Sequence, residues 1–96
     1  MNVKFQPGQI VATPGALEAL ARSGQTADFF LERHLQGDFG EVDSEDRSLN
    51  DQALLDGSRF LSAYRTLKGE KIWIISEAAG DDGKRASTCI LLPDEY

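Results

Sequence analysis

The chain contains one histidine, His34, and three further side chains of types that act in phosphodiester cleavage: Glu77, Arg85 and Thr88. An imidazole or a carboxylate can remove a proton from a ribose hydroxyl, and a guanidinium can stabilise the charge on a phosphate. Glu77 ends one predicted strand and Arg85 and Thr88 begin the next, so a hairpin can bring them together on one sheet. Metal-independent cleavage of RNA is therefore one candidate activity.

The order of helices followed by an antiparallel sheet resembles the small ribonucleases of the barnase and RelE type, which implies catalytic roles for His34, Glu77 and Arg85. A structural interpretation explains the same residues. A lone histidine beside Phe30 on a helix face is commonly a buried residue that bonds a carbonyl or carboxylate. Glu77 and Arg85 can form a cross-strand ion pair. An acidic enzyme would also repel RNA, so the sequence leaves catalysis open and favours a protein that is not an enzyme.

The net charge of −6 comes from one segment of the sequence. Residues 38–56 contain seven acidic side chains and one basic side chain, whereas the remainder has nine of each. Direct nucleic-acid binding is not expected, because phosphate contact needs a basic surface. The segment can be a solvated surface, or it can imitate a row of phosphates and bind a basic protein partner. The residues predicted to contact that partner are Asp38, Phe39, Glu41, Asp43, Glu45 and Asp46.

No metal or cofactor is expected. A zinc site needs three or four close ligands, and the chain has one histidine and one distant cysteine, Cys89. The stretch "AAGDDGKRAST" departs from the phosphate-loop pattern at Ala78 and at Arg85. The sequence has no apolar run of about 18 residues and no apolar signal sequence at its start, so no membrane association is expected. The unpaired Cys89 fits a reducing compartment, so we expect a cytoplasmic protein.

Helix signals fill the first half of the chain. Each predicted helix begins at a capping side chain and ends at a glycine. Spacing of 3.6 residues places Phe30 and His34 on one face of the second helix. In the third helix, Leu49, Ala53 and Leu54 form the predicted apolar stripe, and acidic residues crowd the first turn, where the helix dipole favours them. The predicted helices run from Thr13 to Gly24, from Thr26 to Gly37 and from about Ser44 to Gly57.

After Gly57 the apolar period changes from 3.6 to 2. The segments "RFLSAYRTL", "KIWIISEA" and "KRASTCILL" are predicted strands joined by short turns. Near the start of the chain, "QIVAT" is a short β-branched run that can form an edge strand. The predicted fold is one α+β domain over residues 1–96, with about three N-terminal helices packed on one face of a C-terminal three-stranded antiparallel meander.

Four stretches carry a resemblance to a known family: "QIVATPGALEAL", "ERHLQGDFG", "ALLDGSRFLSAYRTLKGEKIWIISEA" and "TCILLPDEY". The chain resembles small uncharacterised bacterial proteins of plasmids and other mobile elements, labelled plasmid-related protein or type I restriction endonuclease subunit M. A chain of 96 residues lacks the nucleotide-binding domain that a methyltransferase subunit needs. The resemblance therefore implies an accessory protein that acts on host defence. In that family the junction between the last two strands is shorter, so Glu77 and Arg85 are further apart here.

Three functional hypotheses remain open. The first is a small acidic interaction protein of mobile-element type that inhibits host restriction or CRISPR defence through residues 38–56. The second is the metal-independent ribonuclease that uses His34, Glu77 and Arg85. The third is a structural or oligomerising module, for example a homodimer. The sequence favours the first hypothesis, with a basic protein as the partner.

Overall fold

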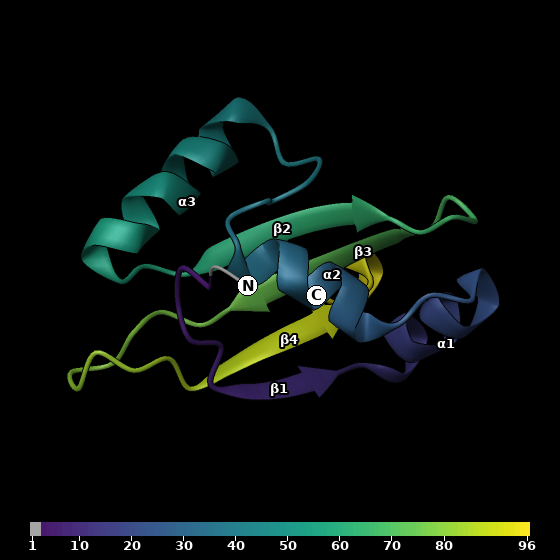
Figure 1. Cartoon of the computed structure of the whole chain (residues 1–96), viewed down its shortest axis with the longest axis horizontal. Coiled ribbons are helices and arrows are strands. Elements are labelled where there is room, and N and C mark those ends of the chain that lie inside the picture. Colours follow the sequence, from purple (N-terminus) through teal and green to yellow (C-terminus); the bar gives the residue numbers. More distant parts are fainter. Residues whose placement is uncertain (1–2) are drawn as a thin grey trace.

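Three helices separate the first strand from the other three strands (Figure 1). The computed structural model describes residues 3–96. The chain ends in a short 3₁₀ helix, η1, which follows the last strand. The elements are β1 (Gln9–Ala12), α1 (Pro14–Ser23), α2 (Ala27–Leu35), α3 (Ser44–Asp56), β2 (Phe60–Arg65), β3 (Lys71–Ser76), β4 (Ser87–Leu91) and η1 (Pro93–Glu95).

The four strands form one mixed sheet in the order β1-β4-β3-β2. β2, β3 and β4 are antiparallel neighbours, and β1 pairs in parallel with β4, from Gln9 opposite Ser87 to Ala12 opposite Ile90. The prediction of a three-stranded antiparallel meander is therefore wrong. The run at residues 9–12 is an edge strand of the sheet, and the predicted fold left it out. Its partner lies at the other end of the sequence, so no local turn signal indicates the pairing.

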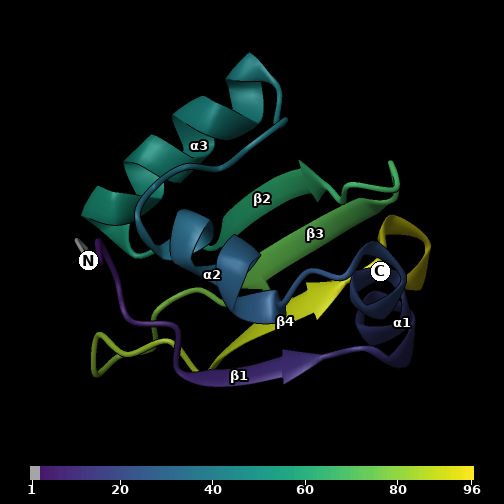
Figure 2. The same ribbon diagram turned by 45° about the vertical axis from the view of Figure 1, so that its right-hand side comes forward.

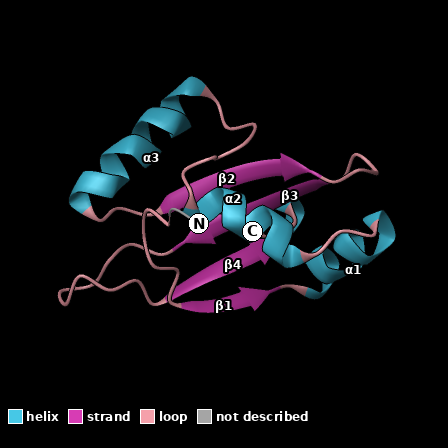
Figure 3. Ribbon diagram, viewed as in Figure 1, coloured by secondary structure: helices cyan, strands magenta, loops and turns pink. Residues whose placement is uncertain are grey.

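Two of the helices cover one face of the sheet. α1 buries small side chains, such as Ala16 and Ala19, and α2 buries Phe30 against Tyr64 and Ile74 of the sheet. α2 lies across the sheet, whereas α3 lies beyond the edge strand β2 (Figures 2 and 3). The prediction that all three helices pack on one face is therefore also wrong.

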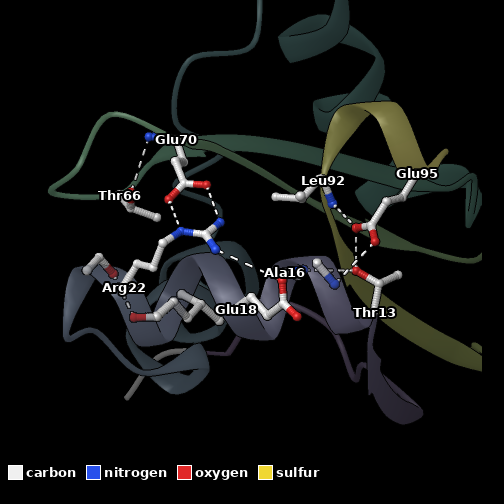
Figure 4. Close-up of polar contacts among 11 residues, drawn as sticks. Thr13, Ala16, Glu18, Arg22, Thr66, Glu70, Leu92 and Glu95 are labelled. Atoms are coloured by element: carbon white, nitrogen blue, oxygen red, sulfur yellow. Dashed lines mark hydrogen bonds and ion pairs between the residues drawn. The ribbon is translucent and has the colours of Figure 1, made fainter.

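Polar contacts fix both ends of α1 (Figure 4). At the N-terminal end, Thr13 Oγ1 donates to Glu95 Oε1 at 2.5 Å, and the Gly15 amide donates to Glu95 Oε2 at 3.2 Å. At the C-terminal end, Arg22 binds the Glu70 carboxylate through two nitrogens, at 2.9 and 2.6 Å. Both sets are exposed and add little stability. They set the position of α1 relative to η1 and the β2–β3 turn.

The outer edge of β2 is closed by other parts of the chain. Asn50 Nδ2 of α3 donates to the Leu61 carbonyl at 2.7 Å, and Asn50 Oδ1 accepts from the Leu61 amide at 3.0 Å. The next outward-facing residue, Ala63, donates to the Phe39 carbonyl at 3.0 Å and accepts from the Glu41 amide at 2.6 Å. An exposed strand edge invites pairing with other chains. These four hydrogen bonds therefore protect the β2 edge.

The "GDFG" turn brings the chain close enough to make two of these bonds. Gly37 has a φ of 86° and follows α2, and Gly40 has a φ of 73° and forms a parallel bridge with Ala63. A Cβ atom on Gly40 would overlap the Ala63 carbonyl oxygen and crowd the Tyr64 ring. Glycine is therefore required at position 40 by both its backbone conformation and the close approach.

α3 buries fewer of its apolar side chains than the sequence predicts, because it lies at the edge of the sheet. Of the predicted stripe, Ala53 is buried, whereas Leu49 and Leu54 are exposed together with Leu55. Asn50 is the second buried residue of the helix. α3 meets the edge of a sheet and not its face, so the contact favours a small side chain and an amide that can bond the free strand backbone.

We expect Asn50→Ala to lower the free energy of unfolding by about 2 kcal/mol, because it leaves the backbone groups of Leu61 without partners. Urea denaturation measures the change. Gln52→Ala is the control, since Gln52 lies exposed on the same helix, and its effect should stay within about 0.5 kcal/mol. Equal effects of the two substitutions would show that the amide does not close the edge.

Candidate functional site

His34 is completely buried between α2 and the sheet. Its Nδ1 lies 2.5 Å from the Ser62 hydroxyl of β2, and its Nε2 lies 2.9 Å from the Ser76 hydroxyl of β3. Ser76 Oγ lies 2.6 Å from Thr88 Oγ1 of β4, and Thr88 donates to the carbonyl of Pro7 at 2.8 Å. These five groups form an unbroken chain of hydrogen bonds across three strands, which we call the His34 chain.

The carbonyl at one end determines the direction of the bonds in the His34 chain as far as Nε2 of the imidazole. A carbonyl only accepts, so the Thr88 hydroxyl donates to Pro7 and accepts from the Ser76 hydroxyl. Ser76 Oγ must then accept from His34, which places the imidazole proton on Nε2. Because burial keeps the imidazole neutral, Nδ1 carries the lone pair and accepts from the Ser62 hydroxyl. His34 is thus a neutral imidazole of defined tautomer.

Burial keeps this imidazole neutral. Desolvation, with a smaller contribution from the positive charge of Arg85, lowers the pKa of His34 to about 3. The rings of Phe5, Phe39 and Phe60 present edges or faces to the imidazole at centroid distances of 5.3, 6.2 and 6.3 Å. The Nδ1 lone pair is occupied and the ring has no exposed surface. An outside substrate therefore has no atom of His34 to contact.

Arg85 is bound to the backbone of its own chain. Its Nη1 donates to the carbonyls of Ser58 and Glu77 at 2.7 and 2.8 Å, and its Nη2 donates to the carbonyl of Ala53 at 3.4 Å. The guanidinium lies over the Phe60 ring, 4.6 Å from its centroid. Partial burial lowers the pKa of Arg85, although the group stays charged. Arg85 thus joins the end of α3, the start of β2 and the end of β3.

The structure does not bring the four candidate catalytic residues into one accessible site. His34 and Thr88 are internal members of the His34 chain, Arg85 bonds the backbone carbonyl of Glu77, and the Glu77 side chain is exposed. Within residues 3–96, no ion pair joins Glu77 to Arg85. The ribonuclease hypothesis gains no support from this arrangement.

Ser62 and Ser76 are not among the site residues predicted from the sequence. The available signal was their position: Ser62 shares a strand face with Phe60 and Tyr64, which are core residues. A serine on an inward strand face needs a buried partner, and His34 is the polar side chain on the facing helix. Combining these two observations would have indicated the contact.

The acidic segment divides into residues with local roles and residues without them. Asp38 bonds Arg33 at 2.8 Å, and that guanidinium holds the pKa of Asp38 below its usual value. Glu41 bonds Arg65 at 3.0 Å. Asp43 is the N-cap of α3 and accepts from the amide of its first turn at 2.8 Å. These three carboxylates therefore shape the loop before α3.

Phe39 cannot serve as an exposed anchor in this segment. Its side chain is buried and stacks on Phe60 with a centroid distance of 5.6 Å. Of the six residues predicted to contact a partner, Glu45 and Asp46 are the acids on α3 itself, and Asp51 and Asp56 continue the acidic surface along the helix. The remaining acidic side chains of this segment therefore lie on α3.

A groove of about 280 Å³ lies between α3 and the start of β2. Leu49 and Asp46 line it from the helix, and Leu61 and Arg59 line it from the strand side. The groove combines apolar side chains with both signs of charge. Its full lining consists of Asp46, Leu49, Asn50, Gln52, Asp56, Ser58, Arg59 and Leu61.

We expect the stability of the protein to fall as the pH drops from 7 to 5. The folded-state pKa of His34, about 3, lies below the unfolded value of 6.5, so the unfolded chain binds the proton first. The contribution of His34 is complete above pH 6.5 and is lost progressively towards pH 3. The loss should reach about 2 kcal/mol at pH 5.

Urea denaturation at several pH values measures this slope. His34 is the chain's single histidine, so no other side chain has an ordinary pKa in this range. A free energy of unfolding that stays constant between pH 7 and pH 5 would show that His34 is accessible to protons in the folded protein. In the variant His34→Gln the slope should disappear.

Across residues 3–96, no helix is long and apolar enough to cross a membrane, and no group of three or more histidine, cysteine or acidic side chains is placed to hold a metal ion. Comparison of the chain with protein-family models, with curated proteins and with solved structures gives no match. The function must therefore be inferred from the residues and their arrangement.

Proposed function

We propose that the chain is a non-enzymatic interaction protein that binds a basic protein partner through α3. One observation carries this proposal: within its 13 residues, α3 buries only Asn50 and Ala53 and leaves three leucines, Leu49, Leu54 and Leu55, exposed among carboxylates. A helix that packs only to stabilise its own domain normally buries its apolar residues. Here Leu55 is almost fully exposed, and Leu49 and Leu54 remain partly exposed where they line two grooves beside the helix.

The composition of this surface supports a role in protein binding. Apolar side chains at the centre of an interface supply most of the binding energy, and charged residues around them guide association and select the partner. Leu55 is 90% exposed on the side of α3 that faces away from the sheet. Glu45 and Asp51 are exposed on the same helix. The surface should therefore attract a basic partner that also offers an apolar depression.

The chemistry of the acidic helix narrows the class of partner. A row of carboxylates on a rigid helix can occupy a basic cleft that normally holds the phosphates of a nucleic acid. The resemblance to proteins of mobile elements makes restriction and CRISPR complexes the first partners to test. Inhibition of such a complex would follow from occupation of its nucleic-acid cleft, and no catalytic residue would be needed.

Leucine truncation tests the apolar part of this surface. We expect Leu55→Ala to weaken binding of a purified restriction or CRISPR complex by about tenfold or more, because it removes a central apolar contact. Leu67→Ala is the matched control, since Leu67 is 80% exposed in the β2–β3 turn, far from α3 in the sequence. Calorimetric titration measures both affinities. Equal affinities for the two variants would contradict a role for α3.

Charge reversal tests the acidic part. The double variant Glu45→Lys, Asp51→Lys should abolish binding, because it replaces attraction to a basic cleft with repulsion. Asp81→Lys, Asp82→Lys changes the net charge by the same amount in the β3–β4 hairpin and should leave binding intact. The design avoids Asp43, whose side chain caps α3. Circular dichroism checks that α3 stays folded in both variants.

A further inference from the structure

The edge of the sheet at β1 is open, in contrast to the edge at β2. The Gln9 amide donates to the carbonyl of Ala86, just before β4, at 3.0 Å, and the Thr13 amide donates to the carbonyl of Ile90 in β4 at 2.9 Å. Hydrogen bonding alternates along an edge strand, so the N–H and C=O groups of the intervening even-numbered residues, 10 and 12, point away from the sheet. Figures 1 and 2 show no segment of the described chain beyond β1.

The open edge is short, and it has neither a charged side chain nor a covering segment. Residues 5–17 contain no charged side chain, although 27% of the chain is charged. After Gln9, the side chains of β1 are apolar on both faces of the sheet, with Ile10 on one face and Val11 on the other, and both are exposed. Proteins normally block a free edge with lysine, proline or a covering segment. The chain applies such a cover at β2 and omits it at β1.

We propose that β1 pairs with β1 of a second copy of the chain, antiparallel across a two-fold axis, to form one continuous sheet through both copies. An antiparallel strand pair is self-complementary, because each copy contributes the same outward N–H and C=O groups. The uncharged strand brings no like charges together at the axis. A second copy of the chain can therefore supply hydrogen-bond partners for the outward backbone groups of β1.

The distribution of charge also favours a second copy of the chain as the partner of β1. All of the net charge lies in residues 38–56. Four of the seven acidic side chains in this segment belong to α3, which lies beyond β2 at the opposite edge. In the paired sheet, seven strand spacings separate the two β2 strands, about 34 Å. That distance exceeds a Debye length of about 8 Å several times over, so two copies of charge −6 meet with little repulsion.

The pairing goes beyond the proposed function and does not depend on it. If both hold, the dimer displays two α3 helices at opposite ends of one sheet, and it can engage two basic sites at once. Such bivalent binding raises the apparent affinity when both sites are within reach. The pair buries only a four-residue strand from each copy, so we expect a dimer that forms in a concentration-dependent way.

Sedimentation velocity over a concentration series tests the pairing. The wild-type chain should be a dimer at high concentration, and Val11→Lys should raise the dimer dissociation constant by about tenfold or more, because two lysines approach each other at the axis. Val3→Lys is the control, since Val3 and Val11 are both 40% exposed and the same residue type. It should dimerise as the wild type does.

A mixing experiment separates loss of pairing from loss of folding. Val11→Lys and Val11→Glu should each be monomeric, and a mixture of the two should form a heterodimer, because the charges at the axis then attract. A wild type that is monomeric at every concentration would overturn the proposal. A dimer that Val11→Lys leaves unchanged would overturn it too, and so would binding of β1 to a strand of a different protein in place of a second copy.

Discussion

The buried imidazole of His34 constrains the three strands around it, because each ring nitrogen needs a hydrogen-bond partner that water cannot supply. Ser62, Ser76 and Thr88 provide those partners from β2, β3 and β4, and the N-terminal segment closes the series with the Pro7 carbonyl. A buried polar group without a partner would be costly, so this chain of bonds fixes the register of α2 against the sheet. The core thereby excludes the chain's one histidine from contact with a substrate.

The two edges of the sheet differ in how their backbone groups are satisfied. At the β2 edge, Asn50 and the loop around Phe39 satisfy the free backbone, and α3 is held there with Leu55, Glu45 and Asp51 exposed. At the β1 edge, the backbone is open and uncharged. The net charge thus lies at one edge of the sheet and the open, uncharged strand at the other, and the two proposed contacts use opposite edges.

Local signals in the sequence predicted the helices well. Thr13, Thr26 and Asp43 cap them as expected, because capping depends on residues a few positions apart. The sheet was predicted only in part, since the parallel pairing of β1 joins distant segments. For the site, the structural interpretation of His34 follows from its helix face, but its serine partners and the exposure of Leu49 depend on where α3 and the strands meet. Periodicity cannot supply that information.

The protonation state of His34 is the most direct observable, and nitrogen NMR of the labelled imidazole measures it. We expect Nε2 to be protonated and Nδ1 to be unprotonated at pH 7, with both shifts unchanged down to pH 5. An imidazole that titrates with a midpoint near its ordinary pKa of about 6.5, and that exchanges its proton rapidly with water, would contradict a purely structural histidine. Such an imidazole could take part in acid–base catalysis.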